Sequence, residues 1–373
     1  MPYIERAHYS QLIELLRPLL IMLMCWAHIP FIYGYGSASL SEPQTLLGPF
    51  FRDVISRGAV PVLTVISGYL AYYSFNRKSY LRFVGDKTKR VFLPFVLWNL
   101  ILLGLLWALF RYGGYVLNEE VVAIENRNDV LRAVLGINRL PINQPLYFLR
   151  DLFLISLFCP LFQLLARHYI SALLFAMLCT GYALTTLTPH LFTYGVMYRS
   201  DMVLFFFIGF LFARSGFSLP QATPREVAAG LALLAVFCAA TTLYLGATNP
   251  DIDLYLKGRT LFALGFLVLL PCFMSGLLAV RDSRCGRFLR AISPYSFIVF
   301  LSHFILIYGF FELQKRTGFS LDNRSPLLKQ AIFVAIYSAA CLCFGVLLKK
   351  TYLQLGSFSS LAWQAWRHGR QPG

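Results

Sequence analysis

Two ionisable residues, Arg17 and His28, stand in the first apolar stretch of the 373-residue chain, with ten residues between them. On an α-helix, eleven steps of about 100° exceed three full turns by only about 20°, so both side chains project from one face. They lie about 16 Å apart along the axis. Arginine binds phosphate well, and a neutral imidazole is a competent general base near pH 7. The pair suits one substrate that has phosphates near Arg17 and a group to be deprotonated near His28.

The same spacing also fits a structural role, in which Arg17 reaches lipid phosphates and His28 forms a hydrogen bond inside a helix bundle. Pro18 directly follows Arg17 and has no backbone N–H to donate to Glu14. The regular helix is therefore expected to begin or to kink at Pro18. Both interpretations require that this stretch be embedded in a membrane, so the composition decides whether they apply.

The composition indicates a membrane protein. Apolar residues make up 58% of the chain and charged residues 13%, against about 45–50% and about 25% in soluble proteins. The mean hydropathy is +0.63. A soluble protein this apolar would expose large apolar patches to water. Seven of the eight cysteines lie in apolar runs and none forms a C-x-x-C pair, so we expect small buried residues, with no disulfide and no metal site.

Ten stretches are long and apolar enough to cross the ~30 Å hydrocarbon core as helices. They are residues 12–33, 54–75, 91–111, 146–166, 169–188, 196–213, 226–246, 259–280, 294–312 and 327–348. The sequence thus predicts an all-α, polytopic integral membrane protein with about ten transmembrane helices. A single transmembrane domain is expected over 1–350, followed by a short cytoplasmic tail over 351–373, with no appended soluble domain.

The charge distribution predicts the orientation of these helices. With the N-terminus inside, one side of the membrane receives 19 basic and 5 acidic residues, and the other receives 14 and 12. Cytoplasmic loops carry the excess of lysine and arginine, so both termini are expected in the cytoplasm, with residues 77–90 inside and residues 112–145 outside. The net charge of +16 is then a consequence of topology, and no nucleic acid partner is expected.

Four segments resemble the membrane-bound acyltransferase-3 family, which O-acylates bacterial surface glycans and other acceptors. Arg17-x10-His28 resembles the family's signature in the first span. Residues 57–69 are similar to its R-x-x-V-P-x-F-F-x-x-S-G-[FY] motif, residues 145–153 to P-L-W-F-L-R-D-L-F, and residues 296–303 to S-F-x-x-Y-L-x-H. The matches occur in order over most of the chain, and the expected number of spans agrees with the family.

The resemblance implies an acyl-CoA donor, most simply acetyl-CoA. Arg17, Lys87 and Arg90 would bind its phosphates, with Arg17 and His28 as the catalytic residues. The family often has an R-x-x-R pair before the third span, and here Lys87 replaces the first arginine. Lysine still binds phosphate, but as a point charge rather than a fork. His28 would either deprotonate the acceptor hydroxyl or carry the acyl group itself.

Asp53, Arg57, Arg150 and His303 are the candidate residues of the acceptor site. Asp53 and Arg57 stand one helical turn apart, so they either form a local ion pair or flank the catalytic pocket. Asp151 follows Arg150 and would suit the first turn of a helix, where capping is an alternative to a functional role. His303 lies near the middle of its span, either as a satisfied buried histidine or as a residue that lines a cavity.

The favoured function is transfer of an acyl group from cytoplasmic acyl-CoA to a hydroxyl of a cell-surface glycan, exopolysaccharide or lipid-linked oligosaccharide. The reaction would take place at the outer face of the bacterial inner membrane, with acyl-CoA, the acceptor and the lipid bilayer as partners. The alternative is a transporter or exporter of a glycan or its precursor, without covalent chemistry. Many transporters have internal repeats and matched broken helices, and neither is evident in this sequence.

Overall fold

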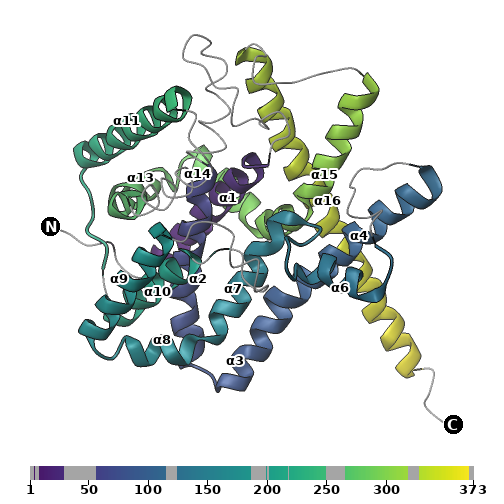
Figure 1. The fold of residues 1–373 in the computed structure, drawn as a ribbon, viewed down its shortest axis with the longest axis horizontal. Coiled ribbons are helices and arrows are strands. Elements are labelled where there is room, and N and C mark those ends of the chain that lie inside the picture. Colours follow the sequence, from purple (N-terminus) through teal and green to yellow (C-terminus); the bar gives the residue numbers. More distant parts are fainter. Residues whose placement is uncertain are drawn as a thin grey trace.

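The computed structural model describes Ile4 and residues 8–28, 56–114, 124–185, 199, 201–216, 218–248, 265–317 and 327–368, and this part of the chain is all-helical (Figure 1). The α-helices are α1 (Tyr9–Trp26), α2 (Ala59–Asn76), α3 (Tyr80–Lys87), α4 (Leu93–Gly113), α6 (Arg127–Leu135), α7 (Tyr147–Leu157), α8 (Cys159–Leu165), α9 (Tyr169–Thr185), α10 (Asp201–Ser215), α11 (Pro224–Thr248), α13 (Leu270–Val280), α14 (Arg284–Ile292), α15 (Ser296–Thr317) and α16 (Leu327–His368). Short helical turns η5 (Ser56–Gly58), η6 (Thr88–Phe92), η7 (Gln144–Leu146) and η9 (Ser293–Tyr295) precede or join them.

Four helical segments of the described chain are long and apolar enough to cross a membrane, and a bent pair makes a fifth. They are Tyr9–Trp26, Tyr80–Gly113, Arg284–Phe310 and Ala331–Thr351, with Gln144–Leu157 and Cys159–Leu165 bent by 56° as the pair. The chain is therefore a multi-pass membrane protein. A helix also lies within each of the ten stretches expected from the sequence, although the number ten itself stays a prediction.

Helix α1 differs from its expected limits at both ends. It begins at Tyr9 and continues through Pro18 to Trp26, so the expectation that the regular helix starts at Pro18 was wrong. Leu12, Leu15 and Leu16 before the proline are all buried, and their packing offsets the one lost backbone hydrogen bond. The helix also ends before His28, which lies in the following turn and donates its backbone N–H to a carbonyl of the last helical turn at 3.1 Å.

Helices α2 and α10 pack with their backbones in direct contact. A Cβ atom on Gly68 would lie 2.0 Å from the carbonyl oxygen of Phe206, and one on Gly209 would lie 1.9 Å from that of Val65. Small residues let helices in membranes approach this closely, which strengthens their dispersion contacts. The Gly68 of the second-span motif is thus explained by packing, which holds α10 and the segment before it in a fixed position.

The N-terminal end of α1, here called the Tyr9 end of the bundle, gathers segments that the charge count assigns to one side of the membrane. The Tyr9 hydroxyl accepts a hydrogen bond from the backbone N–H of Leu219 at 2.8 Å. Arg281 Nη1 donates to Gln11 at 3.4 Å, and the ring of Tyr69, in the second half of α2, lies 6.0 Å from that of Tyr9. The opposite end of α1 is called the His28 end.

Candidate functional site

His28 and His303 meet at the His28 end of the bundle. Their ring centroids lie 5.6 Å apart, with the ring planes tilted by 44°. His28 is partly exposed in the turn after α1, whereas His303 is fully buried in α15. The edge of the Phe304 ring also packs against His28, at 5.9 Å between centroids. The structure therefore brings the predicted catalytic histidine together with one predicted acceptor-site residue.

The hydrogen bonds of His303 fix its tautomer. Its Nδ1 atom lies 2.7 Å from the carbonyl oxygen of Phe300, and a carbonyl oxygen can only accept, so Nδ1 carries the hydrogen. Nε2 is then an acceptor, and it is buried without a partner among the described residues. One ring nitrogen is thus satisfied inside the helix. That His303 also lines a cavity stays a prediction.

A loop over residues 136–143, between α6 and η7, is anchored beside His303. The backbone N–H of Asn143 donates a hydrogen bond to Asn99 Oδ1 at 2.9 Å. The side-chain Oδ1 atom of Asn143 is buried and accepts no hydrogen bond within the described chain. Its side-chain Nδ2 donates to the carbonyl oxygen of Leu301 at 3.2 Å. These bonds connect the loop to Asn99 of α4 and to Leu301 of α15. Leu301 stands two residues before the buried His303.

Four charged residues form a cluster in the interior, here called the buried charge cluster: Arg150, Asp151, Arg199 and Asp201. Arg150 Nε donates to Asp151 Oδ1 at 3.0 Å, and the backbone N–H of Arg199 donates to Asp151 Oδ2 at 2.9 Å. The guanidinium of Arg199 binds Asp201 through two contacts, Nε to Oδ1 at 2.9 Å and Nη2 to Oδ2. The cluster joins α7 to the start of α10.

Asp151 does not cap its own helix. Helix α7 begins at Tyr147, so Asp151 lies beyond the first turn, and its carboxylate binds the Arg150 side chain and the Arg199 backbone instead. Arg150 Nη1 also donates to the carbonyl oxygens of Leu135 and Gly136 at the end of α6. Arg150 is itself buried, at 5% exposed. Because its guanidinium binds these two carbonyl oxygens, Arg150 fixes the start of the 136–143 loop.

The candidate phosphate-binding residues come from three elements, α1, α3 and η6. Arg17 is exposed on α1, and Arg90 is exposed on the π-helical turn η6. Lys87 is partly buried at the end of α3, with its Nζ atom 5.4 Å from the centroid of the Phe83 ring. No hydrogen bond or ion pair among the described side chains joins Arg17 to Lys87 or Arg90. Single π turns occur often at functional sites.

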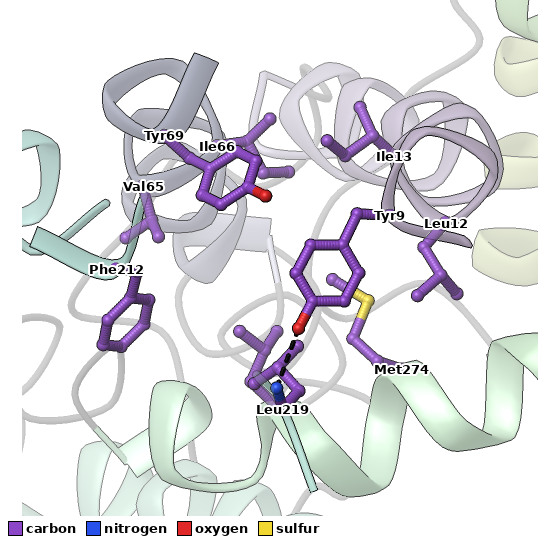
Figure 2. Close-up of a pocket in the computed structure, with 10 residues that line it drawn as sticks. Tyr9, Leu12, Ile13, Val65, Ile66, Tyr69, Phe212, Leu219 and Met274 are labelled. Atoms are coloured by element: carbon purple, nitrogen blue, oxygen red, sulfur yellow. Dashed lines mark hydrogen bonds between the residues drawn. The ribbon is translucent and has the colours of Figure 1, made fainter. Parts of the chain in front are cut away.

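An apolar pocket also lies at the Tyr9 end (Figure 2). Its lining comes from α1, α2, α10, α13 and the segment before α11, and includes Ile13, Ile66 and Met274. Ile13 precedes Arg17 by one helical turn in the direction away from His28. The pocket is therefore separate from the histidine pair, and its lining is apolar apart from the phenol groups of Tyr9 and Tyr69.

Two of the candidate acceptor-site residues have no described side chain. Asp53 lies outside the described residues, and Arg57 is described only as part of the backbone of η5. The expected ion pair between them is therefore not tested. Ser56 in the same turn has a buried hydroxyl that makes no hydrogen bond within the described chain.

Comparison with known proteins shows the family of the chain. A family model described as an acyltransferase domain matches residues 11–350. The chain belongs to the acyltransferase-3 family. This acyltransferase is 29% identical over 347 residues to the succinoglycan biosynthesis protein ExoH of Rhizobium meliloti (strain 1021), over 89% of each chain. No solved structure matches it. The resemblance inferred from four motifs is confirmed, and an acyltransferase domain favours an enzyme over an exporter.

The acyltransferase also contains polar residues that the sequence analysis did not select. Arg199 and Asp201 were noticed only as an interruption at the start of an apolar stretch, and Arg139 only as one of the basic residues on the predicted outer side. An arginine and an aspartate directly before an apolar run are a signal for a buried ion pair. Their partner Asp151 is distant in the sequence, so no local pattern connects it with them.

Proposed function

We propose that this protein transfers an acyl group, acetyl in the simplest case, from cytoplasmic acyl-CoA to a hydroxyl of a surface glycan. The acceptor is an exopolysaccharide or a lipid-linked oligosaccharide on the outer side of the bacterial inner membrane. Membership of the acyltransferase-3 family supports the proposal that the transferred group is an acyl group. The similarity to a succinoglycan biosynthesis protein supports a polysaccharide acceptor.

The observation that carries this proposal is the contact between His28 and His303, whose rings lie 5.6 Å apart. A sugar hydroxyl has a pKa far above 7, so its attack on a thioester needs a base, which typically contributes about 10²–10⁴-fold. A partly exposed imidazole beside a buried acceptor nitrogen provides a place to deprotonate that hydroxyl. The pair lies at the C-terminal end of α1, about three helical turns from the exposed Arg17 in the middle of that helix.

The reaction balances in either of two sequences. In the first, His28 takes the proton as the acceptor oxygen attacks the thioester carbon; the C–S bond breaks, and CoA leaves and takes up the proton as a thiol. In the second, the His28 imidazole attacks the thioester carbon, the C–S bond breaks, and CoA leaves as a thiol with the imidazole proton. The acceptor hydroxyl then attacks the acyl-imidazole, the C–N bond breaks, and the hydroxyl proton returns to the imidazole. Both sequences yield an O-acyl ester and free CoA.

The donor would bind at the Tyr9 end. The positive charges of Arg17, Lys87 and Arg90 suit the phosphates of CoA, and an arginine can bind a phosphate through two parallel N–H bonds. Arg17 and Arg90 are exposed, so both stay solvated in the absence of the donor. We place this end in the cytoplasm, with both termini and ten spans, because of the excess of basic residues on that side.

The acceptor would bind at the His28 end. Arg57 belongs to η5, which directly precedes α2, and Asp53 stands four residues before it in the sequence. We propose that both flank the acceptor. His303 offers its Nε2 atom as an acceptor for a sugar hydroxyl. Arg150 contributes indirectly, because its bonds to the carbonyls of α6 position the 136–143 loop.

Purified protein in lipid nanodiscs tests the function directly. It is supplied with radiolabelled acetyl-CoA or succinyl-CoA and with a lipid-linked oligosaccharide fraction, and the products are analysed by mass spectrometry. We expect an O-acylated oligosaccharide and stoichiometric free CoA from the wild-type protein, and neither from His28→Asn. Movement of glycan across the bilayer with no release of CoA from any donor would contradict the proposal.

A further inference from the structure

Arg139, in the middle of the 136–143 loop, has two buried nitrogen atoms without a partner. Its Nε and Nη2 atoms make no hydrogen bond with any residue that the structure describes. The side chain as a whole is partly exposed, so the buried edge belongs to a residue near the protein surface. Buried N–H groups on a permanently charged guanidinium are costly to leave unpaired.

A second arginine of the same protein shows what this edge binds. In Arg199 the Nε and Nη2 atoms each bind one carboxylate oxygen of Asp201. These two nitrogens flank one side of the planar guanidinium and present parallel N–H bonds, which match two oxygens of a carboxylate or a phosphate. In Arg139 the corresponding edge is buried but unfilled within the described chain.

The backbone around Arg139 is held in one conformation. Asn138, directly before it, has a φ of 58°, and it is the one non-glycine residue with positive φ in the described part of the chain. Such a conformation is sparsely populated and persists where surrounding contacts enforce it. One of these contacts is the hydrogen bond from the N–H of Ile142 to the carbonyl oxygen of Ala133, at 2.7 Å. The loop thus presents Arg139 from a rigid position.

The loop also lies at the reacting end of the bundle. Asn143 donates to the carbonyl oxygen of Leu301, two residues before His303, whose ring contacts His28. Unpartnered buried acceptors, Asn143 Oδ1 and His303 Nε2, therefore lie on the segments that join Arg139 to the histidine pair. A cationic edge and two hydrogen-bond acceptors, each without a partner in the described chain, are groups that suit an anionic sugar with free hydroxyls.

We infer that the Nε–Nη2 edge of Arg139 binds a two-oxygen anionic group, a carboxylate or a phosphate, carried by the acceptor. The inference rests on the proposed function, because it specifies the acceptor as an acidic one. The anion comes either from an acidic sugar or from the phosphate of a lipid carrier. In both cases Arg139 selects the acceptor and takes no part in proton transfer.

Binding to the full-length protein in nanodiscs tests this inference. The probes are a fluorescent oligosaccharide that ends in glucuronate, the same compound with its carboxylate reduced to an alcohol, and an isoprenyl phosphate. Arg139→Gln should weaken binding of one anionic probe by about 10- to 150-fold and leave the neutral probe unchanged. Weaker binding of the glucuronate probe identifies the sugar as the source of the anion. Weaker binding of the isoprenyl phosphate identifies the lipid carrier.

Arg132→Gln is the matched control, because Arg132 is exposed on the neighbouring helix α6 and its loss removes the same charge. It should leave binding of all three probes unchanged. Arg139→Lys keeps the charge but not the two-pronged edge, so it should restore only part of the affinity. Unfolding temperature and acyl-CoA binding report whether each variant is folded.

If the affinity for each of the three probes is the same in wild type, Arg139→Gln and Arg139→Lys, the inference is wrong. If Arg132→Gln weakens binding of the anionic probe as much as Arg139→Gln does, the inference is also wrong, because the affinity would then depend on the total positive charge and not on Arg139. Failure of the proposed function gives a different result, namely no acyl transfer by the wild-type protein to any acceptor, whatever the binding measurements show.

Discussion

The imidazole rings of His28 and His303 lie 5.6 Å apart, although one residue follows the first helix of the chain and the other belongs to α15. His28 stands in a turn and is partly exposed, whereas His303 is buried and bound to its own helix through Nδ1. The two rings therefore differ in access to substrate. This difference suggests that His28 exchanges the proton or the acyl group and that His303 orients what binds beside it.

Replacing His28 tests the first of these roles. His28→Ala and His28→Asn should lower the acyl transfer rate by at least about 10²-fold, because asparagine keeps one hydrogen bond of the imidazole but takes no proton near pH 7. Expression, thermal unfolding and acyl-CoA binding should stay close to wild type. Transfer is measured with radiolabelled acyl-CoA on purified protein.

His168→Asn is the control for this substitution, because His168 is exposed in the turn between α8 and α9. It should leave transfer unchanged. A His28→Asn protein that folds, binds acyl-CoA and keeps more than roughly a tenth of the wild-type rate would remove His28 from proton transfer, and His303 would be the next candidate. A rate that falls only in proportion to folded protein would indicate a packing role.

Two amide substitutions separate the two nitrogens of His303. Asparagine can replace the Nδ1–H bond to Phe300 but does not reach the position of Nε2, whereas glutamine does reach it. We expect transfer by His303→Asn to be about 5- to 10-fold slower than wild type, corresponding to the loss of one hydrogen bond of about 1 kcal/mol. His303→Gln should be closer to wild type.

Thermal unfolding of both variants is measured alongside the transfer rate. If Nε2 has no role, the two variants should lose activity only as far as they lose stability, and asparagine should be the better substitute because it keeps the bond to Phe300. That order of activities would contradict the role proposed for His303.

The donor site is tested at its two exposed arginines. Arg17→Ala and Arg90→Ala should each weaken acyl-CoA binding by about 10- to 150-fold, because a charge-assisted hydrogen bond to phosphate contributes roughly 1.5–3 kcal/mol. Neither side chain is buried, so folding should be unaffected. Calorimetry measures the affinity, with Arg77→Ala as the control for an exposed arginine at the same end.

Identical donor affinities for wild type and both variants would exclude Arg17 and Arg90 as phosphate ligands. A loss of the same size in Arg77→Ala would show that the bundle end attracts CoA by its summed charge rather than through particular residues. Because exposed charges are screened by salt, that second mechanism would also weaken steeply between low and physiological ionic strength.

The sequence predicted the helical regions well, because apolar runs of membrane length are a strong signal. It also placed Arg17 and His303 on helices, α1 and α15, whereas His28 lies in the turn after α1. It left open whether α1 begins at Pro18 or passes through it with a kink, and it did not predict that the helix begins at Tyr9 and ends at Trp26, since tertiary packing decides these limits. The buried charge cluster and the contact of His28 with His303 join residues distant in the chain, and a single sequence contains no signal for such pairs.

The orientation can be tested with thiols. Cys285 is exposed in α14, which the charge count places inside, and Leu131 is 52% exposed on α6, which it places outside. A membrane-impermeant maleimide on spheroplasts should label Leu131→Cys but not Cys285, and both should react after permeabilisation. The experiment uses a Cys343→Ser background, because Cys343 is the other exposed cysteine of the described chain. Labelling of Cys285 in sealed spheroplasts would reverse the topology.

The buried charge cluster should contribute to folding rather than to chemistry. Asp201→Asn leaves the Arg199 guanidinium, which is 4% exposed, without its charged partner. Breaking a buried ion pair in this way costs about 3–5 kcal/mol, so the free energy of unfolding should fall by that amount. The rate of acyl transfer per folded molecule should stay near wild type. Unfolding is followed in detergent by intrinsic fluorescence.

Glu312→Gln is the comparison, because Glu312 forms an i,i+4 ion pair with the exposed Arg316 and such pairs contribute only a few tenths of a kcal/mol. The double variant Arg199→Met, Asp201→Leu removes both charges of the cluster's Arg199–Asp201 pair and should recover most of the lost stability, since two apolar residues leave no buried charge unpaired. If Asp201→Asn is instead stable but inactive, the cluster takes part in catalysis, and the segment it holds before α10 contacts the substrate.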